Sequence, residues 1–334
     1  MSTHHVIIFP KPGQVELVTR PTADPAPGQV LVQTRLTLIS TGTELTRLSG
    51  DFDPESAWAK TEYPFTPGYN NVGVVVKLGE GVEESWLGKR VAGYGPHTEM
   101  VRAWPQQLQI IPDEVSDEEA VFFTIGEIVM NGLRRADIKF GETLAIVGLG
   151  LLGQMTARIA HIAGAAKVIG IDTAASRRDR LPALPGYAAL DGRHENLPAA
   201  IRDLNDGNLA DVVVELTGQP DLLARELELV RPLGRLLLLS SPKGKSTLDL
   251  NNLCNIPSIT IIGSHNQSHP ADGQPNTPWS RRRHGRLFLD YLTQKRLNLE
   301  GLVSHQDHWR QAPALYDMLL KDRSSAMGVL LKWS

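Results

Sequence analysis

The segment 148–153 carries the residue types and the spacing that can hold a phosphate group. It reads Gly-Leu-Gly-Leu-Leu-Gly, directly follows the apolar run 144–147, and precedes a stretch that can form a helix. In this G-x-G-x-x-G spacing the first glycine permits a sharp turn, the second lets a pyrophosphate approach backbone N–H groups, and the third lets helix and strand pack closely. The free N–H groups and the positive end of the helix then hold the anion. The expected contacts of a dinucleotide are Gly148, Gly150, Leu151, Leu152 and Gly153.

Asp172 is the acidic residue that such a site needs next. It ends a second apolar run and lies 22 residues beyond Gly150. A carboxylate at this place can accept hydrogen bonds from the ribose hydroxyls of the adenosine half, and it repels an added 2′-phosphate. We therefore expect NAD(H) as the favoured cofactor. Arg177 follows closely and can offset the repulsion, so NADP(H) stays possible; the alternative for Arg177 is a solvated charge on a helix.

Polar residues also follow two later apolar runs. Thr217 comes directly after the run 212–216, and Ser240 and Ser241 come at the end of the run that begins at Arg235. Ligands of open α/β sheets bind outside the carboxyl ends of the strands. We therefore expect Thr217, Ser240 and Ser241 to line the ribose on the nicotinamide side.

The elements that position these residues differ between the two halves of the chain. From residue 28 to 39, apolar and polar residues alternate with a period near two, which favours a strand with one buried face. Short segments of this kind, separated by Gly and Pro, continue to about residue 112 and predict a small β-barrel. From about residue 118, strand-like and helix-like segments alternate, and the strands are continuous apolar runs. That pattern predicts an α/β fold with a doubly wound parallel sheet covered on both faces.

This division predicts the domain boundaries. We expect a first domain over residues 1–124 and a dinucleotide-binding domain over residues 125–265. For residues 266–334 we expect a helix over 280–294 and a last apolar strand over 328–333, and we expect this segment to return to the first domain.

Composition limits the partners and the compartment. The chain has 34 Lys and Arg against 37 Asp and Glu, a formal net charge of −3, so no strong field gathers nucleic acid or an anionic membrane surface. Its apolar runs are far shorter than the roughly 20 residues that span a bilayer. Cys254 is the only cysteine, which excludes an intrachain disulfide and a zinc site built on two thiolates. We expect a cytoplasmic protein that binds a small molecule, with no nucleic-acid or membrane partner.

Five further segments match a known family. They are 39–44 (Ile-Ser-Thr-Gly-Thr-Glu), 67–73 (Pro-Gly-Tyr-Asn-Asn-Val-Gly), 88–91 (Gly-Lys-Arg-Val), 95–99 (Gly-Pro-His-Thr-Glu) and 211–218 (Asp-Val-Val-Val-Glu-Leu-Thr-Gly). With the barrel, the dinucleotide fold and the returning tail, the chain resembles the medium-chain dehydrogenase/reductase superfamily over nearly its whole length, and its zinc-type alcohol dehydrogenases in particular. The first and fourth segments most resemble the branch that includes bacteriochlorophyllide a dehydrogenase. The resemblance implies a GroES-like catalytic domain, a Rossmann domain, and a homodimer formed through the Rossmann domain.

The metal ligands of the zinc-using relatives are not matched. The resemblance places Thr41 where those relatives carry a cysteine, Tyr69 and Asn70 where they carry His-Glu, and Thr124 at about the third ligand position. Threonine hydroxyls and a phenol bind Zn²⁺ poorly near neutral pH. The segment 91–102, which corresponds to the structural zinc site, also lacks cysteine. We therefore expect no zinc and no other metal.

Without a metal, hydrogen-bond donors or a general acid must control the charge on the substrate oxygen. The resemblance places Thr43 at the hydroxyl position of a proton relay, Tyr69 and Asn70 at the former metal site, and His97 on the pocket wall. We expect Tyr69 or His97 to exchange the proton, and Thr43 and Asn70 to hold the oxygen. His97 titrates near neutrality, whereas Tyr69 needs a neighbouring charge to acidify it. Tyr69 and His97 have packing roles as alternatives, and Thr43 can cap a helix that starts near Glu44, a secondary candidate.

The expected function is zinc-independent hydride transfer between a nicotinamide cofactor and a secondary alcohol or ketone of a small molecule. Two alternatives remain open. One is an NAD(P)H-dependent reductase of an activated C=C bond or a quinone, and the other is a nucleotide-binding protein without turnover.

Overall fold

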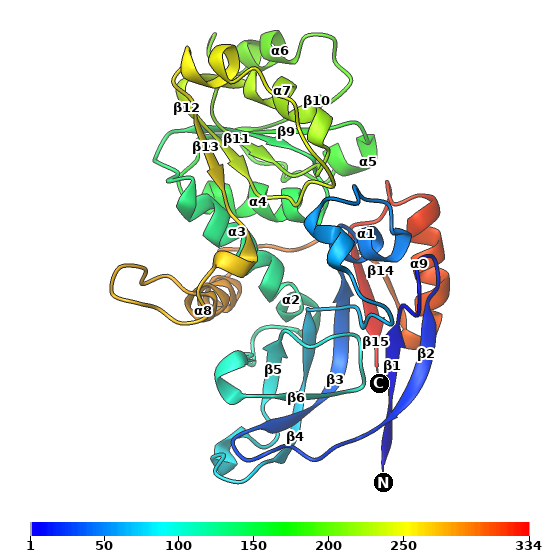
Figure 1. The fold of residues 1–334 in the computed structure, drawn as a ribbon. Helices are drawn as coiled ribbons and strands as arrows, with labels where there is room; N and C mark the ends of the chain where they lie inside the picture. The colour runs from blue at the N-terminus through cyan, green and yellow to red at the C-terminus, as the bar shows by residue number, and fades with distance from the viewer. Residues whose placement is uncertain (1, 334) are drawn as a thin grey trace. The chain divides into compact units, whose positions relative to one another are not determined.

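A computed structural model describes residues 2–333 of the chain, which folds as two units (Figure 1). Unit 1 contains Met1–Phe52, Ala57–Thr124 and Gly285–Ser334. Unit 2 contains Asp53–Ser56 and Ile125–His284. Among the described residues, no helix is long and apolar enough to cross a membrane.

The second boundary differs from the one expected after residue 265. The segment 266–284 stays with unit 2 because it is bonded to helix α3 (Phe123–Arg135): Arg134 Nε donates to His284 Nε2 at 3.1 Å, and His269 Nδ1 lies 4.0 Å from Glu127 Oε1. These contacts join residues that are distant in sequence, so composition did not reveal them.

Unit 1 is built on a seven-stranded sheet with the order β14-β15-β3-β4-β5-β7, in which β6 also pairs with β3. In β3, Gln33 and Arg35 are exposed while their neighbours are buried, which is the alternation expected of a strand with one face on the core. A separate hairpin joins β1 and β2. The strands are β1 Thr3–Ile8, β2 Glu16–Pro21, β3 Val30–Ile39, β4 Asn71–Leu78, β5 Arg90–Gly93, β6 Met100–Ala103, β7 Gln109–Ile110, β14 Val303–His308 and β15 Gly328–Lys332.

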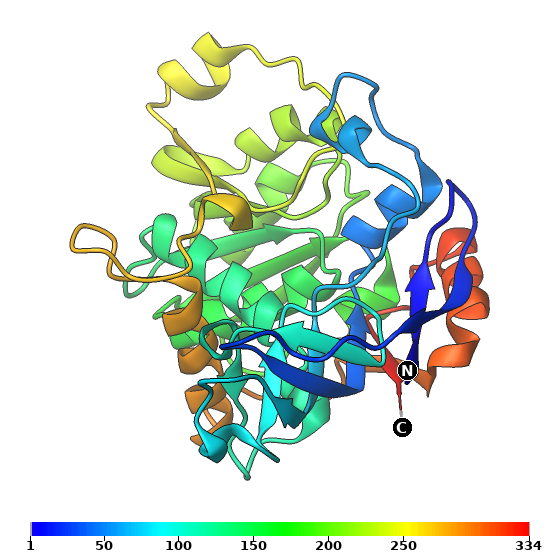
Figure 2. The ribbon, with the colours of Figure 1, turned by 60° about the horizontal axis from the view of Figure 1, so that its bottom comes forward.

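The C-terminal segment completes unit 1, as expected. Strand β15 pairs antiparallel with β3, and Figure 2 shows this last segment, in red, beside the N-terminal strands in blue. Tyr316 and Leu319 pack with Phe9, Ile39 and Trp333 in one buried cluster. The helices of unit 1 are α1 Thr43–Ser49, α2 Asp117–Ala120 and α9 Ala312–Lys321, with short helices η1 Ala57–Lys60, η2 Glu84–Trp86, η3 Pro105–Gln107 and η7 Trp309–Gln311.

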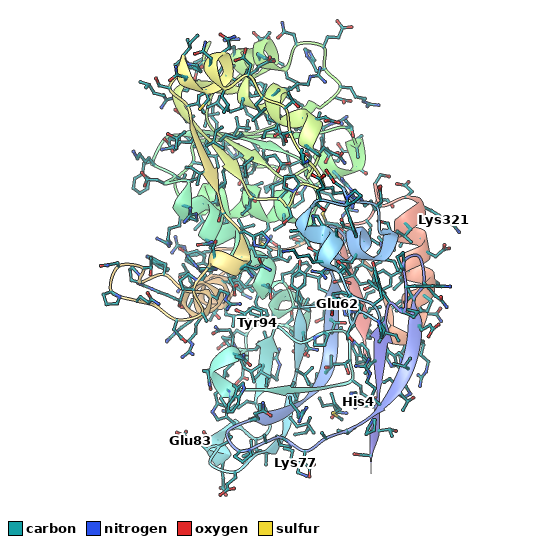
Figure 3. All side chains as sticks on the ribbon, in the orientation of Figure 1. His4, Glu62, Lys77, Glu83, Tyr94 and Lys321 are labelled. Atoms are coloured by element: carbon teal, nitrogen blue, oxygen red, sulfur yellow. The ribbon has the colours of Figure 1, made fainter. Side chains whose placement is uncertain are left out.

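The loop between β5 and β6 brings polar residues to the interior of unit 1. Tyr94, labelled in Figure 3, lies in this loop with its ring centroid 5.2 Å from that of Phe123. His97 follows three residues later and is fully buried. The loop therefore reaches the core near the start of α3.

Unit 2 is a six-stranded parallel sheet with the order β10-β9-β8-β11-β12-β13. Helix α4 lies on one side of the sheet and α6 and α7 on the other (Figure 1), so the central strands are buried on both faces. The strands are β8 Thr143–Val147, β9 Lys167–Asp172, β10 Tyr187–Asp191, β11 Ala210–Glu215, β12 Val230–Leu238 and β13 Thr260–Gly263. The helices are α4 Leu151–Ile162, α5 Ala175–Arg178, α6 Leu197–Leu204 and α7 Leu223–Leu227, with η4 Pro220–Leu222, η5 Asn251–Asn255 and η6 Asn266–Ser268. The boundaries of the two units fall within α3 and α8 (Arg281–Thr293).

Candidate functional site

The three glycines of the turn between β8 and α4 differ in whether the surrounding structure leaves room for a side chain. Gly148 has a φ of +97°, and a Cβ there would lie 2.9 Å from the Leu216 carbonyl carbon. A Cβ at Gly153 would lie 2.0 Å from the Gly148 oxygen. Gly150, in contrast, has a φ of −65°, and a Cβ there meets no atom within 4 Å. Packing does not require a glycine at 150, but the open space beside its backbone suits an approaching phosphate.

The N–H groups that begin α4 receive no side-chain cap. Gly150 is the N-cap residue, and the first intrahelical bond is donated by Gln154 N to the Gly150 oxygen at 2.9 Å. The N–H groups of Leu151, Leu152 and Gly153 therefore precede the hydrogen-bonded ladder of the helix. Such groups bind anions with the help of the helix dipole. The turn and the helix end together fit the pyrophosphate of a dinucleotide.

Asp172 is bonded to the same turn. Its Oδ2 accepts a hydrogen bond from Leu149 N at 2.8 Å, and its Oδ1 accepts one from Ala174 N at 2.9 Å. Each carboxylate oxygen has a second lone pair, which leaves acceptor capacity for a ribose hydroxyl. Arg177 Nη1 lies 3.5 Å from Oδ2. Asp172, which favours NAD(H), and Arg177, which can offset that preference, therefore form an ion pair at the carboxyl end of β9.

Glu215 holds the polar groups that follow β11 and β12. Its Oε1 accepts hydrogen bonds from Thr217 N at 2.6 Å, from Thr217 Oγ1 at 2.8 Å and from Gly218 N at 2.8 Å, and its Oε2 accepts one from the Ser240 hydroxyl. Thr217 and Ser240 thus keep only oxygen lone pairs for a cofactor, while Ser241 is half-buried beside them. Sequence reasoning gave Glu215 no role, although an acid at the end of an apolar strand was the available signal.

Glu226 is a second buried acid in this part of unit 2. It is 2% exposed, and neither of its carboxylate oxygens has a hydrogen-bond partner. Burial, and after it the charge of Glu215, raises the pKa of Glu226 from 4.5 to about 8. Glu226 therefore keeps its proton at neutral pH, while Glu215 accepts four donors.

In unit 1, three hydroxyl groups meet at the end of β3. Tyr69 Oη lies 2.5 Å from Ser40 Oγ, and the Thr43 hydroxyl also bonds to the phenol. Ser40 follows β3, Thr43 begins α1 and Tyr69 precedes β4, so the antiparallel pairing of β3 with β4 brings them together. We term Ser40, Thr43 and Tyr69 the hydroxyl cluster. Thr43 and Tyr69 were expected here, whereas Ser40 was missed. Thr43 lies within α1 instead of capping it, since Gly42 is the N-cap residue.

The phenol of Tyr69 keeps its proton at neutral pH. Burial raises the pKa of Tyr69 above 10.0, the hydrogen bonds of Ser40 and Thr43 act in the opposite direction, and the nearby Glu44 raises the pKa further. The neighbouring charge that Tyr69 needs for a lowered pKa is not supplied by Glu44, because the charge of Glu44 is negative and raises this pKa. Near neutrality, Tyr69 can donate a hydrogen bond or a proton, but it is not a base.

The donors at the former metal positions do not fit zinc. Thr41 and Thr124 carry hydroxyls, and Thr124 Oγ1 donates to the Tyr69 carbonyl oxygen at 3.2 Å. The Tyr69 hydroxyl is bonded within the hydroxyl cluster. Zn²⁺ takes thiolate, imidazole and carboxylate ligands in proteins. In the part of the chain that the structure describes, no three His, Cys, Asp or Glu side chains are grouped so that they could hold a metal ion.

Asn70 and His97 lie in the interior of the protein, and both are 0% exposed. Asn70 Nδ2 lies 3.5 Å from the Leu38 oxygen, and His97 Nε2 lies 3.0 Å from Glu44 Oε2. Asn70 is fully buried, whereas Tyr69, the residue before it, is half-buried. Neither side chain reaches solvent in this structure, and the roles expected of Asn70 in holding the substrate oxygen and of His97 in exchanging its proton stay predictions.

Two family models match the chain. Residues 26–109 match the alcohol dehydrogenase GroES-like domain, and residues 152–279 match the zinc-binding dehydrogenase family. The first match covers most strands of the sheet in unit 1. The second covers the parallel sheet of unit 2 from α4 onward.

Curated relatives at 27–28% identity are dehydrogenases. The chain is 28% identical over 265 residues to D-guloside 3-dehydrogenase of Shigella flexneri, covering 77% of this chain and 75% of that protein. It is 27% identical over 293 residues to L-threonine 3-dehydrogenase of Pyrococcus horikoshii, covering 77% of this chain and 81% of the relative.

Solved structures share the whole fold. A short chain alcohol dehydrogenase from Escherichia coli CFT073, complexed with NADH, superposes with a TM-score of 0.80 at 18% identity, covering 99% of this chain and 100% of its own. A protein from Sinorhizobium meliloti 1021, bound to NADP, superposes with a TM-score of 0.83 at 20% identity, with the same coverage. The GroES-like and Rossmann-like architecture expected from the sequence is thereby confirmed.

Proposed function

Because the chain belongs to the zinc-type alcohol dehydrogenase-like family of medium-chain dehydrogenases, we propose that it is a zinc-independent oxidoreductase that interconverts a secondary alcohol and a ketone of a small polar molecule with NAD(H). The relatives named for oxidation at a secondary carbon, D-guloside 3-dehydrogenase and L-threonine 3-dehydrogenase, support the reaction class.

The observation that carries the proposal is the geometry at Gly150. Its backbone adjoins open space, and it begins a helix whose first N–H groups have no side-chain cap. Gly148 and Gly153 are needed for the turn and for packing. A side chain at position 150 would contact no protein atom, so the glycine there is explained by the close approach of a ligand to its backbone.

A nicotinamide dinucleotide, when bound, supplies the hydride acceptor or donor. The protein must then manage the proton on the substrate oxygen. In ketone reduction, the Tyr69 hydroxyl donates a hydrogen bond to the oxygen and passes its proton to it as hydride reaches carbon. Ser40 and Thr43 donate to the phenolate oxygen that forms and limit its charge. In alcohol oxidation the same steps run in reverse.

The donor chemistry supports a reaction without zinc. Hydroxyls stand at the ligand positions, and two of them, on Tyr69 and Thr124, already bond to protein atoms. Zinc as Lewis acid and Tyr69 as hydrogen-bond donor perform the same task, which is to stabilise negative charge on the substrate oxygen.

We propose NAD(H) as the preferred cofactor because Asp172 Oδ1, which accepts one hydrogen bond from Ala174 N, retains a lone pair for a ribose hydroxyl, and because the carboxylate repels a 2′-phosphate. The Asp172–Arg177 pair also allows weaker binding of NADP(H). The Asp172 carboxylate repels the 2′-phosphate of NADP(H) unless the Arg177 side chain turns away from Asp172 and pairs with the phosphate.

Turnover of a panel of secondary alcohols and ketones, followed by nicotinamide absorbance in chelator-treated protein, tests the proposal. We expect turnover of an alcohol–ketone pair, a preference for NAD(H), and clearly less than one zinc per chain by metal analysis. Stoichiometric zinc that is lost together with activity on chelation contradicts the zinc-free mechanism. Turnover of enones or quinones alone, or nucleotide binding with no turnover at all, contradicts the reaction class.

A further inference from the structure

Glu44 gathers three hydrogen-bond donors inside unit 1. Ser40 N donates to its Oε1 at 2.8 Å, His97 Nε2 lies 3.0 Å from its Oε2, and the Tyr316 hydroxyl donates to the same Oε2. Glu44 is 1% exposed, and His97 and Tyr316 are fully buried. A buried carboxylate is costly unless donors surround it, and these three supply what an ionised carboxylate needs. We term Glu44, His97 and Tyr316 the carboxylate cluster.

Glu44 fixes the backbone that carries both partners of the Tyr69 phenol. Thr43 is its neighbour in the first turn of α1, and the bond from Ser40 N to Glu44 Oε1 closes a short loop over residues 40–44. Ser40 Oγ and the Thr43 hydroxyl both bond to Tyr69. A shift of the Glu44 side chain therefore moves both contacts at once.

His97 holds the backbone turn that precedes Tyr69. Its N–H donates to the Pro67 oxygen at 2.8 Å, and a Cβ at Gly68 would lie 2.6 Å from His97 N. Gly68 has a φ of +101° and directly precedes Tyr69. His97 thus binds Glu44 through its side chain and the turn before Tyr69 through its backbone.

Tyr316 contributes the donor that comes from farthest along the chain. It lies on α9, with its ring edge against Phe9 at a centroid distance of 5.2 Å. Burial, together with Glu44, raises the pKa of Tyr316 well above 10.0, so its hydroxyl remains a hydrogen-bond donor near neutral pH. Its bond to Glu44 needs no change of protonation during a reaction.

We propose that the carboxylate cluster positions the Tyr69 hydroxyl, with Glu44 as the positioning residue and with His97 and Tyr316 holding it. The inference rests on the proposed function for the use made of the phenol, whereas the geometry stands on unit 1 alone. It assigns a role in the reaction to a tyrosine of the C-terminal segment that touches neither substrate nor cofactor. The negative charge of Glu44 also opposes loss of the Tyr69 proton, which keeps the phenol a donor.

The kinetic test compares two Tyr→Phe variants that each remove one hydroxyl bonded near α1. Tyr316→Phe removes a donor to Glu44, and Tyr63→Phe removes a donor to the Arg47 carbonyl oxygen, on α1 itself. We expect Tyr316→Phe to lower kcat for ketone reduction at least about tenfold, the scale of a hydrogen bond to a charged group, with the KM for the cofactor unchanged. Tyr63→Phe keeps kcat within about twofold. Equal losses in both variants, or no loss in Tyr316→Phe, overturn the inference.

A second measurement does not need turnover. The ultraviolet titration of Tyr69 is isolated by subtracting the spectrum of Tyr69→Phe, and it is then compared with the same difference taken in the Glu44→Gln background. Removing the charge lets the phenol ionise at lower pH, while Tyr63→Phe leaves the Tyr69 titration in place. An unchanged Tyr69 titration in Glu44→Gln overturns the inference. Should turnover be absent but this shift occur, the proposed function fails while the positioning of Tyr69 by Glu44 stands.

Discussion

Glu226→Gln should stabilise the protein, and by an amount that grows with pH. Burial and the charge of Glu215 raise the pKa of Glu226 from 4.5 to about 8. Below pH 4.5, the folded and the unfolded chain both hold the proton. Between 4.5 and 8 only the folded chain holds it, so each pH unit lowers the free energy of unfolding by about 1.4 kcal/mol. The loss is on the order of 3 kcal/mol at pH 7 and levels off above pH 8.

The glutamine side chain has nearly the same shape but does not titrate, so this pH-dependent loss is absent from the variant. A gain on the order of 3 kcal/mol is large against a typical total stability of about 5–15 kcal/mol. Urea unfolding at pH 5, 6.5 and 8 measures it, and Glu228→Gln, an exposed neighbour beyond the same helix, is the matched control. If the stability of the Glu226→Gln variant parallels that of the wild type across these pH values, Glu226 is not a neutral acid in the folded protein.

Four further predictions concern the cofactor turn, Asp172 and the phenol. Gly150→Ala should leave the melting temperature unchanged, because its Cβ meets no atom within 4 Å, but weaken NADH binding at least about tenfold in a fluorescence titration. Gly153→Ala should lower stability by about 1–3 kcal/mol in urea unfolding, because its Cβ falls 2.0 Å from a backbone oxygen. Asp172→Asn should weaken NADH and improve NADPH binding in the same titration, and equal changes for both would remove the ribose assignment. Because the pKa of Tyr69 is raised above 10.0, the rate of alcohol oxidation should rise with pH throughout the range 7–10, and a plateau below pH 8 would contradict Tyr69 as the proton acceptor in that direction.

In unit 2, the sequence predicts the elements that are marked by a local pattern of residue types. The glycine turn, β9 at Lys167–Asp172 and helix α4 follow from spacing and continuous apolar runs. Strand β10 at Tyr187–Asp191 was not expected, because it is a short edge strand whose residues are half-buried or exposed and include none of the β-branched residues that are typical of strands.

The candidate site in unit 1 likewise contains residues that sequence motifs predict and contacts that they do not. Thr43 and Tyr69 lie in motifs that a resemblance can place, and the structure brings them together with Ser40. The inward direction of Asn70 depends on the register of β4, which the motif does not state. Tyr316 is 272 residues from Glu44, so no local pattern announces their contact.

The position of β15 in its sheet bears on how the protein is made. This strand lies between β14 and β3, so it is an interior strand although it is synthesised late. Once residue 284 has left the ribosome, the parallel sheet has all six of its strands, while the sheet of unit 1 still lacks β14 and β15. The nascent chain then presents a free backbone edge at residues 36–39 of β3, which is a template for joining other chains. Loss of residues 328–332 through a premature stop would make that exposure permanent, and such a product should precipitate even though its nucleotide-binding unit is complete.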